Sequence, residues 1–273
     1  MKRRIRILLG LLALLVVVKL PAQAPADTLQ RALQLALKAR FATSDNLGNI
    51  YLINDQNALE KYGPDGRLIA RYTNNRLGQA CGLDATNPLK VLAWYADFRT
   101  VIFLDRTLTM LGELNLIQGG FPEVRTVAAA ADGNIWLYDE GAFQLKKISP
   151  DGALLFESQA LSQIQPARIA VQNIRDNGAE VLACDTSLGV FCFDVYGQFL
   201  RLIPLKGMHS FILIQNYLLY HTAGRLHIQD LQGFYTHQMP LPPVARQAGA
   251  QIWLAPGRLL VQSSGGPLEV WTY

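Results

Sequence analysis

The chain has 273 residues, of which 50% are hydrophobic and 17% are charged, and its 25 basic and 21 acidic side chains give a formal net charge of +4. Five of the basic residues lie within residues 1–26, which contain no acidic residue, so residues 27–273 carry 20 basic and 21 acidic groups and are nearly neutral. A nearly neutral chain lacks the basic surface on which nucleic-acid binding depends, and we expect no nucleic-acid partner.

The first element in chain order is a targeting segment. Four basic residues among the first six precede a twelve-residue apolar run over residues 7–18, and the small residues Ala24 and Ala26 follow. This order predicts a secretory signal peptide over residues 1–26, whereas a transmembrane helix needs about 18–20 apolar residues. We therefore expect export to the periplasm, the cell surface or the extracellular space, with no membrane span in the mature chain.

Residues 27–40 follow the targeting segment and allow two interpretations. Leucines at positions 29, 33, 35 and 37 partly alternate with other residues, which favours an edge strand. The segment is also rich in alanine, leucine and glutamine, which favour a short helix. Both interpretations stay open from the local pattern alone.

A motif of about 25 residues then occurs twice. Residues 45–68 read DNLGNIYLINDQNALEKYGPDGRL and residues 132–154 read DGNIWLYDEGAFQLKKISPDGAL. The copies lie 85 residues apart, which is two units of about 40 residues, the length of one propeller blade. The Gly-Asn and Pro-Asp-Gly motifs within each copy are typical of turns, because neither supplies the dense oxygen ligands of a calcium loop.

Six such units can be placed along the chain, beginning near Phe41, Ala80, Thr126, Arg168, Met208 and Gly249. In each unit a short first strand precedes a strongly apolar second strand, and these second strands read NIYLIND, KVLAWYAD, NIWLYDE, EVLACD, NYLLYH and GRLLVQS. The last unit ends at Tyr273 after three strands, and a closed ring must supply the missing fourth strand. We predict an all-β, six-bladed β-propeller that forms a single domain over residues 27–273 and is closed by residues 28–38 pairing beside residues 268–273.

The repeat resembles the NHL family of β-propeller repeats. The first copy matches the family pattern with Asp45, Gly48, Asn49, Ile50, Tyr51, Pro64, Asp65 and Gly66, and the second with Asp132, Gly133, Asn134, Ile135, Trp136, Pro150, Asp151 and Gly152. The likeness is clear in these two units, about a quarter of the chain, and weaker in the other four. The resemblance implies a six-bladed propeller that binds a protein or a ligand, with lactonase-like and lyase relatives that hold a metal in the channel.

Catalytic motifs are scarce. The expected innermost strands read FATS, GLDAT, VAAAA, IAVQN, FILIQ and QIWLA, and Asp84 is their single acidic residue. All four histidines fall in the fifth unit, where alternation along strands scatters them, and neither a Gly-x-Ser-x-Gly elbow nor a phosphate-binding loop occurs. We therefore predict a non-enzymatic binding module with no catalytic residue, metal or cofactor, and the alternative is a lactonase-like metal-dependent hydrolase or lyase.

Charged residues recur at two positions of the units. A basic residue precedes the first strand, namely Arg40, Arg76, Arg125, Arg168, Lys206 and Arg246. The second strand ends in Asp55, Asp97, Asp139 or Asp185 in four units, and in His221 or Ser263 in the others. Because both connections lie on one face of a propeller, the two sets predict charged rings around one channel mouth. These rings are either a recognition surface for an anionic or protein ligand or an Arg–Asp network between blades.

Trp94 is a further candidate, because it stands with Tyr95 and Phe98 beside a turn on the same face, with Phe121 in a nearby connection. The ligand-binding residues that we predict are thus the arginines 40, 76, 125, 168 and 246, the four aspartates and Trp94. The expected partner is an unknown protein or a component of the cell envelope, and we expect a monomer. Cys184 and Cys192 either pair across a hairpin or remain buried thiols.

Overall fold

The structure is a computed structural model that describes residues 28–165, 168–208, 210–232 and 235–273. The predicted signal peptide, residues 1–26, lies outside the described residues. Within them, no helix combines the length and the apolar character needed to cross a membrane.

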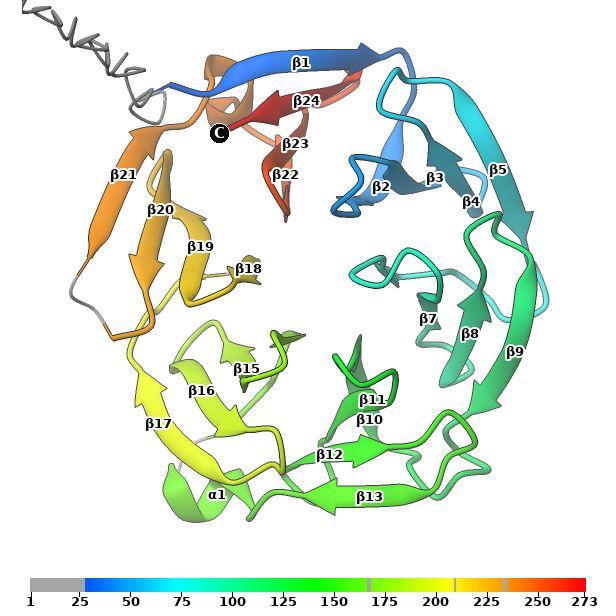
Figure 1. Ribbon diagram of the computed structural model, residues 1–273, viewed down its shortest axis with the longest axis vertical. Helices are drawn as coiled ribbons and strands as arrows, with labels where there is room; N and C mark the ends of the chain where they lie inside the picture. The colour runs from blue at the N-terminus through cyan, green and yellow to red at the C-terminus, as the bar shows by residue number, and fades with distance from the viewer. Residues whose placement is uncertain (1–27, 166–167, 209, 233–234) are drawn as a thin grey trace, which may run out of the picture.

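Six four-stranded antiparallel sheets stand around one axis (Figure 1), and each sheet is one blade. Blade one contains β2 (Ala39–Ser44), β3 (Ile50–Asn54), β4 (Ala58–Tyr62) and β5 (Leu68–Thr73). Blade two contains β6 (Gly82–Asp84), β7 (Val91–Tyr95), β8 (Thr100–Leu104) and β9 (Met110–Asn115). Blade three contains β10 (Val124–Ala129), β11 (Ile135–Asp139), β12 (Gln144–Ile148) and β13 (Leu154–Glu157).

Blade four contains β14 (Asn173–Asp176), β15 (Glu180–Asp185), β16 (Gly189–Asp194) and β17 (Phe199–Ile203). Blade five contains β18 (Phe211–Ile214), β19 (Tyr217–Thr222), β20 (Arg225–Asp230) and β21 (Thr236–Pro240). Blade six contains β22 (Gln251–Ala255), β23 (Arg258–Gln262), β24 (Leu268–Thr272) and β1 (Gln30–Leu35). Two short helical turns, α1 (Leu161–Ile164) and η1 (Pro243–Arg246), lie in connections between blades. The predicted six-bladed propeller is confirmed.

The N-terminal strand closes the ring. β1 pairs with β24 in antiparallel register, with Leu35 opposite Leu268, and Figure 1 shows the two strands side by side at the edge of blade six. The buried side chain of Gln262 fastens this junction: its oxygen accepts from the Ala39 amide at 2.9 Å and its nitrogen donates to the Leu37 carbonyl at 2.9 Å. The predicted strand pairing is confirmed, and the helical alternative for this segment is wrong.

The core lies between neighbouring blades. Trp136 and Tyr138 of β11 pack with Phe191 and Phe193 of β16 in one cluster that joins blades three and four. The second strand of a blade contacts a neighbour on each of its two faces, and all five residues of β7 and of β11 are accordingly buried. This two-sided burial explains why the second strands read as continuous apolar runs rather than as alternating ones.

The turn interpretation of the repeated motifs also holds. Gly48 and Gly66 have positive φ values of 84° and 80°, which glycine adopts without steric cost. The Gly66 amide donates to the Gly63 carbonyl at 2.9 Å and closes the Pro-Asp-Gly turn. Asn49 donates its side-chain amide to the Asp45 carboxylate at 2.7 Å, so its role is to hold the turn together.

Blade four corrects one expected strand. The sequence placed the innermost strand at residues 169–173, but β14 begins at Asn173. Ile169 and Val171 are instead buried in the cluster between blades three and four, so they belong to the approach to the blade. The correction brings Arg175 and Asp176 onto an innermost strand, where Asp84 had been the single acidic residue expected.

The two candidate cysteines for a hairpin bridge are free thiols. Cys184 on β15 and Cys192 on β16 are both buried. They pair across the ladder with Val190 and Leu182 rather than with each other. Both pack as small apolar side chains between blades four and five.

Candidate functional site

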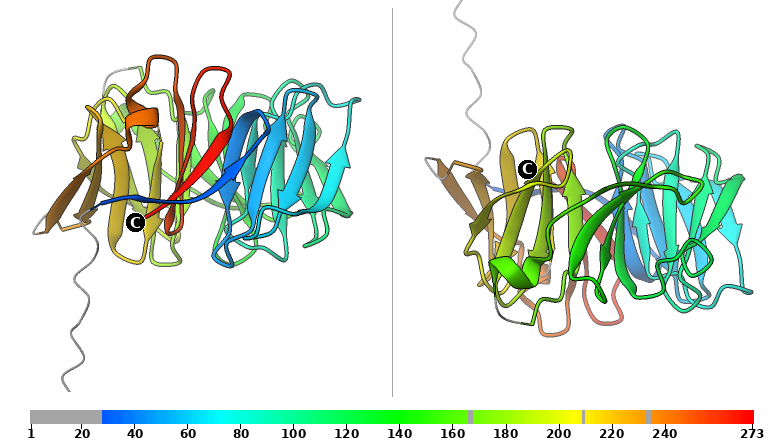
Figure 2. Two further views of the ribbon diagram at one scale, coloured as in Figure 1. Left: turned by 90° about the horizontal axis from the view of Figure 1, so that it is seen from above. Right: turned by 90° about the horizontal axis from the view of Figure 1, so that it is seen from below.

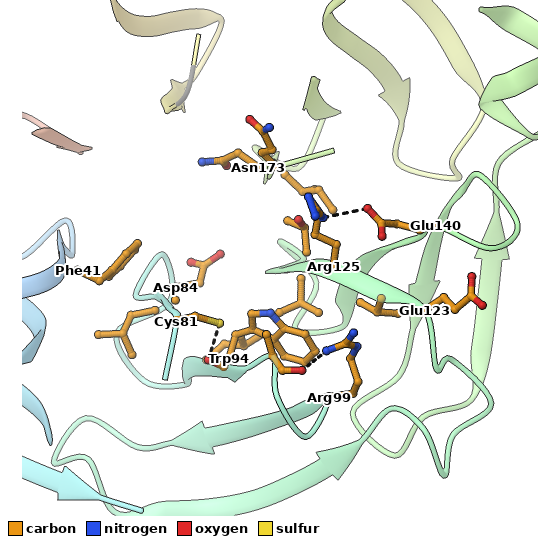
Figure 3. A pocket seen from close by; sticks show the side chains of 18 of the residues that line it. Phe41, Cys81, Asp84, Trp94, Arg99, Glu123, Arg125, Glu140 and Asn173 are labelled. Atoms are coloured by element: carbon orange, nitrogen blue, oxygen red, sulfur yellow. Dashed lines mark hydrogen bonds and ion pairs between the residues drawn. The ribbon is translucent and has the colours of Figure 1, made fainter. Parts of the chain in front are cut away.

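A cavity of about 600 Å³ opens from the channel where blades two, three and four meet. Its wall comes from the innermost strands β6, β10 and β14 and from Phe41 of β2 in blade one, with β7 and the connections at one mouth completing it (Figure 3). The strands run along the axis of the ring, so their connections gather on its two faces (Figure 2). Cavities of this size are typical of sites for small organic ligands.

Six charged side chains line the cavity: Arg99, Arg125, Arg175, Asp84, Glu123 and Glu140. Arg125 forms an ion pair with Glu140, with Nε and Oε1 2.9 Å apart (Figure 3). Arg99 and Arg175 form no ion pair within the described chain, and each donates to a backbone carbonyl instead, that of Ala96 or Ile174. The cavity therefore presents two guanidinium groups that no carboxylate neutralises.

The apolar part of the wall contains one aromatic side chain with an unused donor. Trp94 is 6% exposed, and its indole Nε1 has no hydrogen-bond acceptor in the described residues. The side-chain oxygen of Asn173 likewise has no donor there. Buried polar atoms are usually paired, so both atoms mark this wall as a place where a ligand can supply the missing partner.

Asp84 has a different role. Its two carboxylate oxygens accept from the Thr86 amide at 3.0 Å and from the Ala129 amide at 3.1 Å. Because Ala129 is on β10, this carboxylate joins blade two to blade three. Cys81 also lines the cavity and is exposed there. The surrounding protein nevertheless desolvates the thiolate and so raises the pKa of the thiol.

The predicted arginines separate into three groups. Arg125 lines the cavity. Arg40 donates to the side chains of Asn57 at 2.8 Å and Gln79 at 2.6 Å, and because Gln79 precedes blade two, this guanidinium ties blade one to blade two. The remaining three are exposed outside the cavity, namely Arg76, Arg168 and Arg246.

Three of the four predicted aspartates bind groups other than arginine. Asp139 is buried and pairs with Lys146 at 2.8 Å. Asp185 accepts from the amides of Ala170 and Ser187 at 2.7 Å each. Burial opposes ionisation of this carboxyl, but the hydrogen bonds from Ser187 and from backbone amides outweigh it and lower its pKa. Asp97 accepts from the Gln79 amide at 3.2 Å, and Asp55 is exposed.

No arginine of the predicted set forms an ion pair with an aspartate of that set in the described part of the chain. The structure brings together Arg125 and Trp94 from the predicted residues. Sequence reasoning missed Arg99, Glu123, Glu140, Asn173 and Arg175. Glu140 directly follows Asp139, which is in the predicted set, and Arg175 lies two residues beyond the innermost strand predicted at residues 169–173. A correct register for blade four would have included Arg175, whereas strand register does not distinguish Glu140 from Asp139.

The described residues contain no group of three or more histidine, cysteine, aspartate or glutamate side chains close enough to hold a metal ion. His227 on β20 stacks on Tyr220, with ring centroids 4.7 Å apart. His209 lies outside the described residues. The described histidines, His221, His227 and His237, lie on three different strands of blade five, β19, β20 and β21.

The outer rim is a second feature of the surface. The outermost strands of blades one to four expose large apolar side chains: Leu68, Ile69, Met110, Leu111, Leu154, Leu155, Phe156 and Leu200. They are spread over four blades, and Phe156 forms an edge-to-face contact with Tyr196 at 5.4 Å. This apolar rim is separate from the cavity in the channel.

No family model matches the chain, and no curated protein sequence matches it. Solved structures do. A catalytically inactive variant of virginiamycin B lyase from Staphylococcus aureus, with quinupristin, aligns at a TM-score of 0.57 and 12% identity over 89% of this chain and 81% of that chain. A streptogramin B lyase aligns at 0.57 and 9% identity over 89% and 94%.

PorZ, a bacterial surface component of the type-IX secretion system of Porphyromonas gingivalis, aligns at a TM-score of 0.51 and 11% identity over 86% of this chain and 32% of that chain. At such identities the likeness shows the β-propeller fold alone, and one fold hosts many functions. The function of this chain therefore has to be argued from its own residues.

Proposed function

We propose that this protein is an exported, non-enzymatic binding module that takes its ligand in the cavity between blades two, three and four. The observation that carries the proposal is the composition of that wall. Two unpaired guanidinium groups and two unpartnered buried polar atoms lie in the wall of a cavity of about 600 Å³ that is lined by both charged and apolar side chains. A mixed surface of this kind selects a ligand by geometry rather than by bulk attraction.

A substitution that fills the cavity tests the proposal. Gln172 is exposed and lines the cavity, so Gln172→Trp places a large side chain in it. Gln163 is exposed on α1 outside the cavity, and Gln163→Trp is the matched control. Ligand-observed NMR against a set of organic acids, amines, amides and N-acetylated amino acids should identify compounds that bind wild type and the control but lose binding to Gln172→Trp. The proposal is wrong if every compound that binds is indifferent to Gln172→Trp.

Export and a monomeric state belong to the same proposal. The order of basic, apolar and small residues over residues 1–26 supports export, and the monomeric state is an expectation that the same experiment tests. When the full chain is expressed in a bacterial host, the intact mass of the periplasmic product should show that residues 1–26 have been removed. Light scattering of the same product should give the molar mass of a monomer. A product that retains residues 1–26 contradicts the export part alone.

A further inference from the structure

The chemical class of the ligand can be narrowed further, on the assumption that the proposed function is right. We infer that Arg99 and Trp94 anchor a carboxylate whose attached apolar body fills the cavity. Both residues belong to the hairpin of β7 and β8, and both line the cavity (Figure 3).

Arg99 has a left-handed backbone, with a φ of +49°, which non-glycine residues adopt rarely. Asn57 and Phe143, directly before the third strands of blades one and three, are left-handed as well, so the conformation belongs to this turn and the side chain is what distinguishes Arg99. In blade one the Asn57 side chain holds the structure by accepting from the Ala80 amide at 2.8 Å. The Arg99 guanidinium makes one bond, to the Ala96 carbonyl of its own turn. Turn formation does not account for an arginine at this position.

Two N–H donors of this hairpin have no protein acceptor. They are Nε of Arg99 and Nε1 of Trp94, and both are buried. A buried donor without an acceptor costs free energy, and an anionic oxygen is the acceptor that a guanidinium binds best. These donors identify the wall formed by β7 and β8 as the anchoring point.

The charges of the cavity disfavour a dianion. Three acidic side chains, Asp84, Glu123 and Glu140, line it together with the three arginines. Arg125 is already paired with Glu140, so Arg99 and Arg175 are the guanidinium groups that a ligand can neutralise. A phosphate dianion would face repulsion from the same three carboxylates, whereas a single carboxylate adds half that charge.

The rest of the wall indicates what the carboxylate is attached to. Phe41, Leu83, Leu92, Val124, Val127 and Ile174 contribute the apolar surface of the cavity. Apolar surface binds apolar groups, and the few polar atoms set their orientation. The ligand is therefore a carboxylate next to an apolar group, which a small organic acid and the C-terminus of a peptide both provide.

Calorimetric titration with matched probes tests the inference. The probes are N-acetyltryptophan and its amide, a hexapeptide ending in tryptophan with a free or an amidated C-terminus, and phenyl phosphate. We expect each free acid to bind at least tenfold more tightly than its amide and than phenyl phosphate. Preference for the peptide over N-acetyltryptophan identifies a peptide terminus, and equal affinity identifies a small acid.

Two variants separate anchoring from folding. Arg99→Gly removes the guanidinium and relieves the left-handed backbone, so it should weaken binding of the free acids at least tenfold and leave the urea midpoint unchanged or higher. Ala223→Gly, at a φ of +49° in the corresponding exposed turn of blade five, is the matched control and should leave binding unchanged. Arg99→Lys keeps the charge without the fork of donors and should give an intermediate loss.

The inference is overturned if the amides bind as tightly as the acids, if no free acid binds, or if Arg99→Gly retains wild-type affinity. When other compounds still bind and lose affinity in Gln172→Trp, the proposed function survives and the anchor alone is wrong. When no compound responds to Gln172→Trp, the proposed function fails as well.

Discussion

Replacing Leu35 with alanine tests whether the N-terminal strand holds the ring closed. Leu35 ends β1, is 8% exposed and packs in the cluster that joins blade six to blade one. Removal of a buried leucine side chain loses its transfer free energy and leaves a cavity, at a cost of about 2–5 kcal/mol. For a domain of this size each kcal/mol shifts the melting temperature by about 2–4 °C, so we expect a decrease of about 4–20 °C.

Leu200→Ala is the matched control for this variant. Leu200 is also on an outermost strand, β17, but it is 47% exposed, and its loss should cost less than about 1 kcal/mol. Urea unfolding followed by circular dichroism gives both values from the shift of the midpoint. Equal midpoints for the two variants would refute the reasoning, because they would show that β1 contributes no more to closure than an exposed edge does.

Three further predictions concern other contacts. Gln262→Ala removes the two hydrogen bonds that join β23 to Leu37 and Ala39 at the start of blade one, and it leaves these backbone groups unpaired. Unfolding in urea should therefore show a free energy of unfolding lower by about 1–3 kcal/mol. An unchanged midpoint would show that these hydrogen bonds do not stabilise the junction. Replacing Arg125 and Arg168 together with alanine should change the free energy of unfolding by no more than about 1 kcal/mol, because the Arg125–Glu140 ion pair and the Arg168 side chain are open to solvent. A larger loss in the same urea assay would show that the two arginines tie blades together. Asp185→Asn should destabilise the protein at pH 7, and its difference from wild type should narrow below pH about 4, because a carboxyl with a lowered pKa contributes stability that disappears as it is protonated. A difference that is constant from pH 7 to pH 2 would exclude this origin.

The architecture followed from the sequence because propeller blades repeat their own local rules. The second strands are buried on both faces and so must be apolar throughout, which makes them visible without a partner. The count of strands was equally informative, because a last unit with three strands leaves an edge that a closed ring has to fill. Residues 27–40 were the segment left outside the six units, so ring closure favoured a strand there although the local pattern alone also allowed a helix.

The site was harder to predict because it depends on register and on side-chain partners. Asp139 and Glu140 are neighbours in sequence, but Asp139 ends β11 and pairs with Lys146, whereas Glu140 reaches the cavity and pairs with Arg125. The alternation of side chains along a strand does not predict which of two neighbouring residues at its end faces the cavity, because the following turn changes the direction of the chain.

The sequence by itself therefore determined the number of blades, their order and the strand that closes them, because these depend on hydrophobic pattern and strand count, which are local quantities. The tertiary structure alone decided which charged residues meet. β14 begins at Asn173 because Ile169 and Val171 are taken into the packing between blades three and four, and that shift turns Arg175 into a cavity residue. Arg99 and Arg175 are the unpaired guanidinium groups of the cavity, whereas Glu140 pairs with Arg125 and Asp84 accepts from backbone amides, and these contacts depend on the folded arrangement rather than on any single segment.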